Sequence, residues 1–159
     1  GVRGILIYMA IYLFMNIGAF ACILSMNRGG RMVESIDDLA GLSKTHPLTA
    51  LALAIFMFSM AGIPPLAGFF GKLYIFLAAI EAKLYALAVI GVLTSVVGAF
   101  YYLRLIKIAY FDEVADPLDK SPGTEIYLVL ALTGIVILFF FVYPAPVLTT
   151  AATAAAALF

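Results

Sequence analysis

The chain has 159 residues, of which 65% are hydrophobic and 11% charged, and its mean hydropathy is +1.15. Soluble domains average roughly 45–50% apolar and about 25% charged residues, so this composition excludes a water-soluble domain and predicts a membrane protein. The nine basic and nine acidic residues cancel, which leaves no net positive charge to attract nucleic acid.

Charge-free runs locate the expected membrane spans, because about 20 apolar residues are needed to cross roughly 30 Å of hydrocarbon. We expect four spans, so the sequence predicts an all-α polytopic membrane fold. The small-residue segment 149–157 is expected to be a loosely packed tail. The expected spans cover residues 4–26, 47–80, 84–105 and 126–143.

The second span is predicted to be interrupted at residues 62–68. As one continuous helix, residues 47–80 would measure about 50 Å at about 1.5 Å per residue, which is too long for one crossing. Pro64 and Pro65 lie in the middle of this span. Proline removes a backbone donor, and nearby glycines loosen the chain, so a regular helix cannot continue through this stretch.

The basic residues predict the orientation of the spans. If residues 47–80 cross once, six Lys or Arg residues in or beside the loops 27–46 and 106–125 share one side of the membrane, against two on the other. Two full crossings would divide them four and four. Cytoplasmic loops carry the excess of Lys and Arg, so both loops are predicted to be cytoplasmic, with the C-terminus on the opposite side.

Lys72 is the main candidate for a functional residue, since it follows the helix break by about two turns and precedes eight uncharged residues. A lysine in mid-membrane costs roughly 2.5–3.5 kcal/mol on insertion scales. A buried lysine can exchange its proton near physiological pH. The alternative is that Lys72 reaches the interface or forms a structural pair with an acid.

The interruption is the second signal of function. In transporters, unwound backbone at membrane depth commonly surrounds the ion site. The alternative is a proline kink made only for packing. A lysine within two turns of Pro64 and Pro65 favours the functional interpretation, with this break as part of the site.

Further polar residues are weaker candidates for lining a proton path. Tyr8, Tyr12 and Asn16 fall at i, i+4 and i+8 of the first span, where they could face water or hydrogen-bond to a neighbouring helix. Tyr74 is a similar candidate. In the third span, Tyr102 is expected to anchor the helix at the membrane interface.

Other chemistry is not expected from this chain. Its one cysteine, Cys22, and one histidine, His46, exclude a disulfide scaffold and the usual zinc sites. Phosphate-binding loops, nucleophilic triads and calcium loops are missing from the sequence, so no metal or cofactor is expected and transport of a small ion remains. The chain begins at Gly1 without an initiator Met, so we expect it to be a piece of a larger membrane protein.

Three stretches of the sequence resemble the antiporter-like membrane subunits of respiratory complex I, the proton-pumping NADH:quinone oxidoreductase. Residues 58–74 resemble the broken twelfth helix of that family, and the flanking stretches resemble its eleventh and thirteenth helices. Lys72 followed by Leu73 and Tyr74 is similar to the N-type members. The stretches are FSMAGIPPLAGFFGKLY at 58–74, YMAIYLFMNIGAF at 8–20 and VGAFYYLR at 97–104.

The resemblance implies that residues 1–159 are the C-terminal part, helices eleven to fourteen, of a fourteen-helix proton-translocating subunit in the bacterial inner membrane. Its partners would be the lipid bilayer and other membrane subunits, and the chain itself would bind no cofactor, since the parent complex would hold NADH, quinone, FMN and iron–sulfur clusters in other subunits. The family's lysine in the eleventh helix is missing here, where the sequence offers only Asn16 and the tyrosines Tyr8 and Tyr12. Lys72 is therefore expected to exchange protons with helices upstream of this chain.

Two alternatives to this function remain open from the sequence. A subunit of a cation/proton antiporter or of a membrane-bound hydrogenase has the same ancestry and could contain a similar broken helix. A purely structural membrane scaffold, with Lys72 permanently paired to an acid, belongs to a different class of protein.

Overall fold

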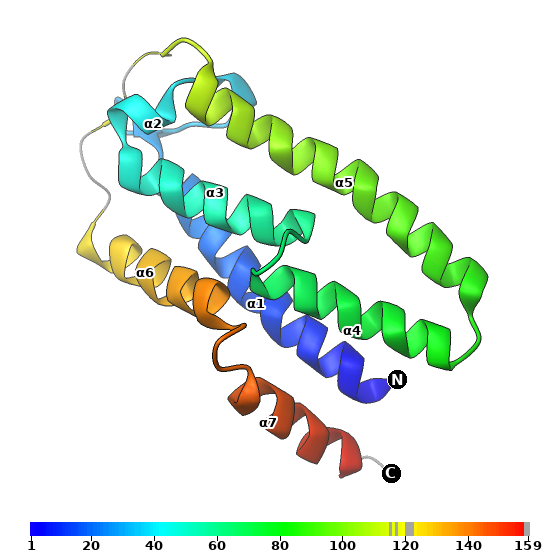
Figure 1. Cartoon of the computed structure of the whole chain (residues 1–159). Helices are drawn as coiled ribbons and strands as arrows, with labels where there is room; N and C mark the ends of the chain where they lie inside the picture. Colours follow the sequence, from blue (N-terminus) through cyan, green and yellow to red (C-terminus); the bar gives the residue numbers. More distant parts are fainter. Residues whose placement is uncertain (115, 117, 120–122, 158–159) are drawn as a thin grey trace.

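The computed structural model describes residues 1–114, 116, 118–119 and 123–157, and almost all of its ordered structure is α-helical (Figure 1). This confirms the predicted all-α class. The larger helices are α1 (Val2–Leu24), α3 (Pro47–Ala61), α4 (Ala67–Glu81), α5 (Tyr85–Phe111), α6 (Thr124–Phe139) and α7 (Ala145–Ala156). Between α1 and α3 lie a short hairpin, β1 (Asn27–Arg28) with β2 (Arg31–Met32), the 3₁₀ turn η1 (Ile36–Leu39) and α2 (Leu42–Thr45).

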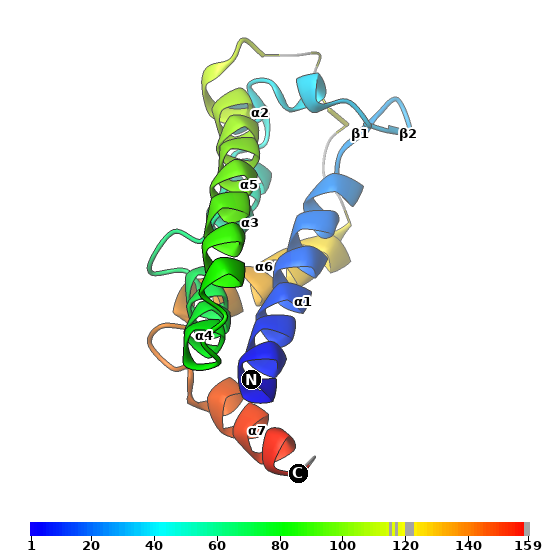
Figure 2. The ribbon, with the colours of Figure 1, turned by 90° about the vertical axis from the view of Figure 1, so that its right-hand side faces the viewer.

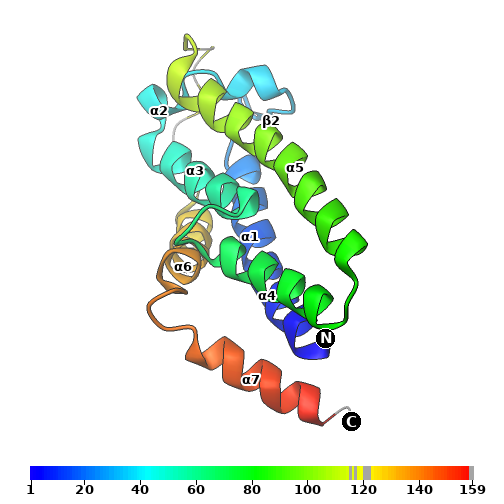
Figure 3. The same ribbon diagram turned by 45° about the vertical axis from the view of Figure 1, so that its right-hand side comes forward.

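Helix α1 is the centre of the bundle. It packs against α3, α4, α6 and α7, and its buried face includes Ile7, Ile11, Met15 and Cys22 at helical spacing (Figure 3). Helix α5 packs instead against α3 and α4, and Figure 2 shows it separated from the middle of α1. The space between α1 and α5 is therefore bounded by α3 and α4.

Among the described residues, two helices are long and apolar enough to cross a membrane alone: α1 with 23 residues and α5 with 27. The predicted second span is divided into α3 and α4, with 15 residues each, which follow one another in the same general direction (Figure 1). The helices break over residues 62–66, and Gly68 already lies inside α4. The predicted interruption is confirmed but is shorter than 62–68.

The C-terminal prediction was wrong. Residues 149–157 were expected to form a loose tail, but residues 145–156 form α7, which packs against α1 and buries Ala151. Pro144 and Pro146 favour the new start, because proline is well suited to the N-cap and first turn of a helix. Alanine has the highest helix propensity, so the alanine-rich segment continues as a helix.

The loops that follow α1 and α5 lie at the same end of the structure and contact each other. The Asp119 carboxylate accepts hydrogen bonds from the N–H groups of Gly29 at 3.0 Å and Gly30 at 2.9 Å. These backbone hydrogen bonds hold the pKa of Asp119 below its ordinary value. An ion pair between Arg28 and Asp38, at 2.7 Å, supports the same hairpin.

Candidate functional site

The break between α3 and α4 begins at a glycine. Gly62 has a φ of +87°, in the left-handed region where a side chain is disfavoured. Its N–H donates to the Ser59 carbonyl at 3.0 Å, and the Ile63 N–H donates to the Phe58 carbonyl at 3.1 Å. This pair of bonds is a Schellman motif, which satisfies the last carbonyls of a helix while turning the chain away.

Pro64 and Pro65 extend this turn on the surface. Both are exposed, they are joined by a cis peptide bond, and the next residue, Leu66, is buried where α4 begins. The two prolines therefore form the connector and line neither of the cavities described below. Their part in the site is to separate the ends of α3 and α4.

Ser59 joins the two half-helices beneath the break. The side chain is fully buried, and its Oγ accepts a hydrogen bond from the Gly68 N–H at 2.9 Å. The Oγ also donates to Sδ of Met15 on α1, at 3.0 Å. A Cβ on Gly68 would overlap the carbonyl oxygen of Ser59, so only glycine permits this approach of α4 to α3.

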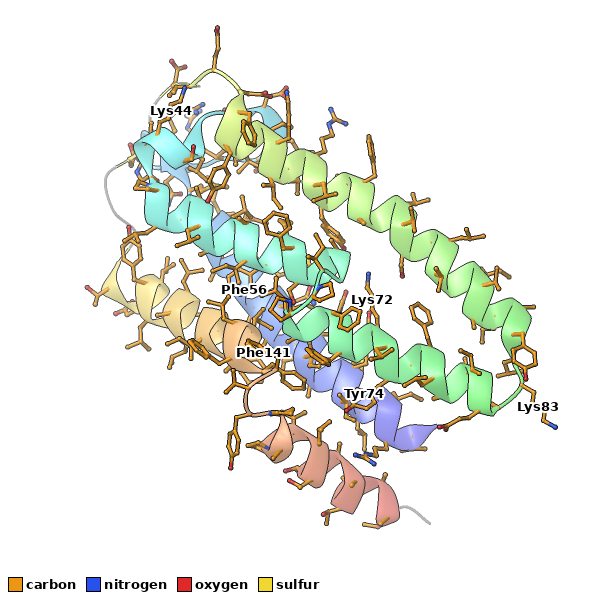
Figure 4. All side chains as sticks on the ribbon, in the orientation of Figure 1. Lys44, Phe56, Lys72, Tyr74, Lys83 and Phe141 are labelled. Atoms are coloured by element: carbon orange, nitrogen blue, oxygen red, sulfur yellow. The ribbon has the colours of Figure 1, made fainter. Side chains whose placement is uncertain are left out.

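Lys72 lies one turn beyond Gly68 on α4 and is half-buried. Its side chain passes over Gly62, and its Nζ lies 3.4 Å from the Ala61 carbonyl oxygen. Figure 4 shows the lysine pointing from the start of α4 toward the space between α3 and α5. The carboxyl end of a helix carries partial negative charge, so the end of α3 stabilises a lysine ammonium there.

A hydroxyl-rich cavity of about 210 Å³ lies on one side of Lys72. It is bounded by α1, α3, α4 and α5, in the gap between α1 and α5 described above. Phenol and hydroxyl groups can donate and accept hydrogen bonds, so this lining can solvate water or a proton beside the lysine. The polar side chains that line it are Tyr8, Tyr12, Lys72, Thr94, Ser95 and Tyr102.

A second cavity, of about 240 Å³, lies on the other side of Lys72 and is mainly apolar. Phe69 and Phe76 of α4 face Val92 and Val96 of α5 across it. Lys72 and Ser95 line both cavities. The lysine thus stands at the boundary between a polar and an apolar compartment.

The structure separates the weaker candidates. Tyr12 lines the hydroxyl-rich cavity and stacks on Tyr8, with ring centroids 5.6 Å apart. Asn16 lies outside both cavities, and its amide donates to the Tyr12 carbonyl at 2.7 Å. Tyr74 also lies outside them, on the other side of α4 from Lys72 (Figure 4).

Three cavity residues on α5 were not expected from the sequence. Tyr102 was assigned to the membrane interface, and Thr94 and Ser95 were not candidates for a proton path, yet all three line the cavity beside Lys72. The signal was present, since 95, 98 and 102 recur at helical spacing as small or polar residues on an apolar helix. The sequence did not indicate which helices this stripe on α5 would face.

Among the described residues, no acidic side chain forms an ion pair with Lys72. The ion pairs there join Arg28 to Asp38 and Lys107 to Asp112, both remote from the break. In the same part of the chain, no three His, Cys, Asp or Glu side chains gather as metal ligands.

The model of the family described as "NADH:quinone oxidoreductase/Mrp antiporter, TM" matches residues 1–98 of the chain. The chain belongs to this family. The match includes α1, the break, Lys72 and Ser95, whereas Tyr102 lies beyond it.

Similarity to individual proteins is more specific than the family match. NADH-quinone oxidoreductase subunit N of Paramagnetospirillum magneticum is 62% identical over 159 residues, covering 100% of this chain and 33% of that protein. The subunit N of Rhodospirillum rubrum is 61% identical, covering 99% of this chain and 32% of that protein. The chain therefore spans about a third of the length of these relatives.

A solved structure supports the fold. Respiratory complex I from Thermus thermophilus, determined with bound aureothin, contains a chain that matches with a TM-score of 0.80 and 30% sequence identity. The match covers 94% of this chain and 34% of that chain. The arrangement of helices in this chain is thus similar to that of a chain in a respiratory complex I.

Proposed function

We propose that the chain is the C-terminal third of a subunit N of bacterial complex I, and that it transfers protons across the inner membrane. The observation that carries this proposal is the position of Lys72, at a helix break, between a hydroxyl-rich and an apolar cavity. The identity of more than 60% to two proteins named subunit N supports the assignment to this branch of the family.

Lys72 holds and releases the transferred proton. With its Nζ at the Ala61 carbonyl, the ammonium form is stabilised by the end of α3. The hydroxyls of Tyr12, Ser95 and Tyr102 provide hydrogen-bonding partners for water in the adjoining cavity. A change in a neighbouring subunit that alters the hydration or charge near Lys72 would shift the balance between its two protonation states.

The rest of the chemistry belongs to other parts of the complex. NADH oxidation and quinone reduction, with FMN and the iron–sulfur clusters, take place in partner subunits, and this chain binds none of these groups. Lys72 exchanges protons with helices upstream of Gly1, because α1 offers Asn16 rather than a lysine and Asn16 lies outside both cavities.

The chain crosses the membrane four times, by α1, by α3 and α4 together, by α5, and by α6. Helix α5 has a largely exposed apolar surface, with Val97 and Phe100 both 73% exposed, which fits contact with lipid or neighbouring membrane helices. The loops around residues 27–46 and 106–125 lie in the cytoplasm, and the C-terminus lies on the opposite side.

A cation/proton antiporter is the second candidate, because the description of the matched family includes Mrp antiporters. The two functions differ in what drives the proton. In a complex I subunit, NADH oxidation drives proton movement without added sodium, whereas an antiporter needs a counter-ion gradient. A membrane-bound hydrogenase subunit would respond to hydrogen rather than to NADH.

The test uses Lys72→Gln and Lys72→Ala in the complete enzyme, assayed in inverted membrane vesicles. NADH-driven proton uptake is expected to fall by about tenfold or more per assembled complex. Lys44→Gln is the control, because Lys44 is exposed, lies in the short helix α2 before α3, and lines neither cavity. Assembled Lys72→Gln enzyme with wild-type proton uptake would overturn the proposal and leave a structural scaffold.

A further inference from the structure

We infer that Ser59 is the positioning residue for Lys72, with its hydroxyl holding the first turn of α4 against the last turn of α3. This inference rests on the proposed function of Lys72. It concerns the distance between the lysine ammonium and the Ala61 carbonyl, which is 3.4 Å in the structure. Ser59 touches neither atom and acts only through the placement of the two half-helices.

The hydroxyl of Ser59, on α3, caps the N-terminus of α4. The first four N–H groups of a helix have no partner within it, and the residue before α4, Leu66, supplies no side-chain cap. The Gly68 N–H is one of these groups, and it donates to Oγ of Ser59 at 2.9 Å. Since Ser59 is fully buried, no bulk water can replace this partner.

Ser59 also fixes the wall of the hydroxyl-rich cavity. Its Oγ donates to Sδ of Met15, so one hydroxyl links α1, α3 and α4. Met15 and Gly68 both line that cavity, whereas Ser59 lies behind them. A displacement at Ser59 therefore changes the side of the cavity that faces Lys72.

The path from Ser59 to Lys72 is short and rigid. Lys72 is four residues after Gly68, so the two lie one turn apart on the same face of α4. Ala61 is two residues after Ser59, in the last turn of α3. The absence of a side chain on Gly68 lets its backbone rest directly on the Ser59 peptide. The Ser59–Gly68 bond thus sets the register in which Lys72 reaches the end of α3.

Ser25 provides a matched control. It is another buried serine, at the C-cap of α1, and its hydroxyl donates to the Cys22 carbonyl of that helix at 2.6 Å. Within the described part of the chain, this hydroxyl links α1 to no other element. Replacing either serine with alanine removes a buried hydroxyl. Only the Ser59 replacement removes a bond between the two halves of the broken span.

The experiment compares Ser59→Ala, Ser59→Cys and Ser25→Ala in the complete enzyme, by the pH profile of NADH-driven proton uptake per assembled complex. In Ser59→Ala, the midpoint of the alkaline limb is expected to move by about half a pH unit or more toward lower pH, because the ammonium loses its fixed carbonyl partner. Ser59→Cys, with a weaker acceptor, is expected to fall between Ser59→Ala and wild type.

A profile of Ser59→Ala that superimposes on wild type, or an equal shift in Ser25→Ala, would overturn the inference. If Ser59→Ala does not assemble, the profile of Ser59→Cys decides, since the thiol keeps the side-chain volume. Lys72→Gln distinguishes the proposed function of Lys72 from the role of Ser59. Normal uptake in Lys72→Gln removes the proposed function, whereas impaired uptake with an unshifted Ser59 profile removes only the role of Ser59.

Discussion

Lys72 covers Gly62 so closely that a side chain on the glycine would crowd the lysine. A Cβ on Gly62 would lie 3.2 Å from Cδ and 3.6 Å from Nζ of Lys72. The same glycine has a φ of +87°, which the Schellman turn at the end of α3 requires. Gly62 therefore both ends α3 and leaves room for the Lys72 side chain to pass over the end of that helix.

Gly62→Ala is expected to lower proton uptake as well as stability. The left-handed backbone costs an alanine about 1–2 kcal/mol, and the added methyl group pushes the Lys72 side chain away from the Ala61 carbonyl. Gly29→Ala is the control, because Gly29 also has a positive φ, of +59°, but an added Cβ there would meet none of the described residues beyond its chain neighbours within 4 Å. Thermal inactivation and NADH-driven proton uptake of the assembled enzyme measure the two effects.

Gly29→Ala is expected to share the backbone cost and to leave proton uptake per complex unchanged. Equal uptake in the two variants would contradict a close relation between Gly62 and Lys72. It would then reduce the role of Gly62 to that of a turn residue.

The contact between Asp119 and the hairpin is expected to depend on pH. The hydrogen bonds from Gly29 and Gly30 favour the ionised carboxylate and lower the pKa of Asp119. A lowered pKa means that the stabilisation is complete above the ordinary value of 3.8 and is lost as the pH falls through the lowered value. At neutral pH the contact between the loops following α1 and α5 is intact.

Hydrogen exchange of the Gly29 and Gly30 amides measures this contact. Asp119→Ala is expected to exchange faster than wild type at neutral pH, and the difference is expected to vanish once wild-type Asp119 is protonated. Asp119→Asn, which keeps one neutral acceptor, is expected to lie between them. Identical protection in wild type and Asp119→Ala at neutral pH would show that the hairpin is held by other contacts.

The four proposed crossings predict opposite accessibility for two exposed lysines. Lys44 lies before α3 and Lys83 follows α4, and Figure 4 shows them at different ends of the structure. In an enzyme without other accessible cysteines, Lys44→Cys is expected to react with an impermeant thiol reagent from the cytoplasmic side only. Lys83→Cys is expected to react from the opposite side only.

The native Cys22 leaves this labelling readable, because it is fully buried in α1. Reaction of both positions from the same side would mean that α3 and α4 do not complete one crossing between them. The cytoplasmic assignment of both large loops would then fail as well.

The position of the candidate site was readable from the sequence because it depends on local chemistry. Pro64 and Pro65 cannot continue a helix, so the interruption follows from backbone sterics within a few residues. Lys72 is conspicuous because a cation is costly among uncharged residues wherever they pack in a membrane. Both features were expected, and the structure places the Lys72 ammonium, from α4, at the carboxyl end of α3.

The surroundings of Lys72 were not readable, because they depend on which helix faces which. Tyr102 belongs to the cavity and Asn16 does not, although both lie on apolar helices with similar local signals. Ser59 was not a candidate from the sequence, because its hydroxyl gains a partner on the next helix only through the close approach of Gly68. The alanine-rich C-terminal segment forms α7, which packs against α1, and the sequence did not indicate this contact.

Composition and hydropathy by themselves determined that this chain belongs in a membrane, where one helix breaks, and which cation has to be explained. These properties follow from transfer free energies and backbone sterics, which act residue by residue. Only the tertiary structure decided which hydroxyls share a cavity with Lys72 and what holds the two half-helices in register. Those properties arise from contacts between residues far apart in the chain, and helical periodicity alone does not specify which faces meet.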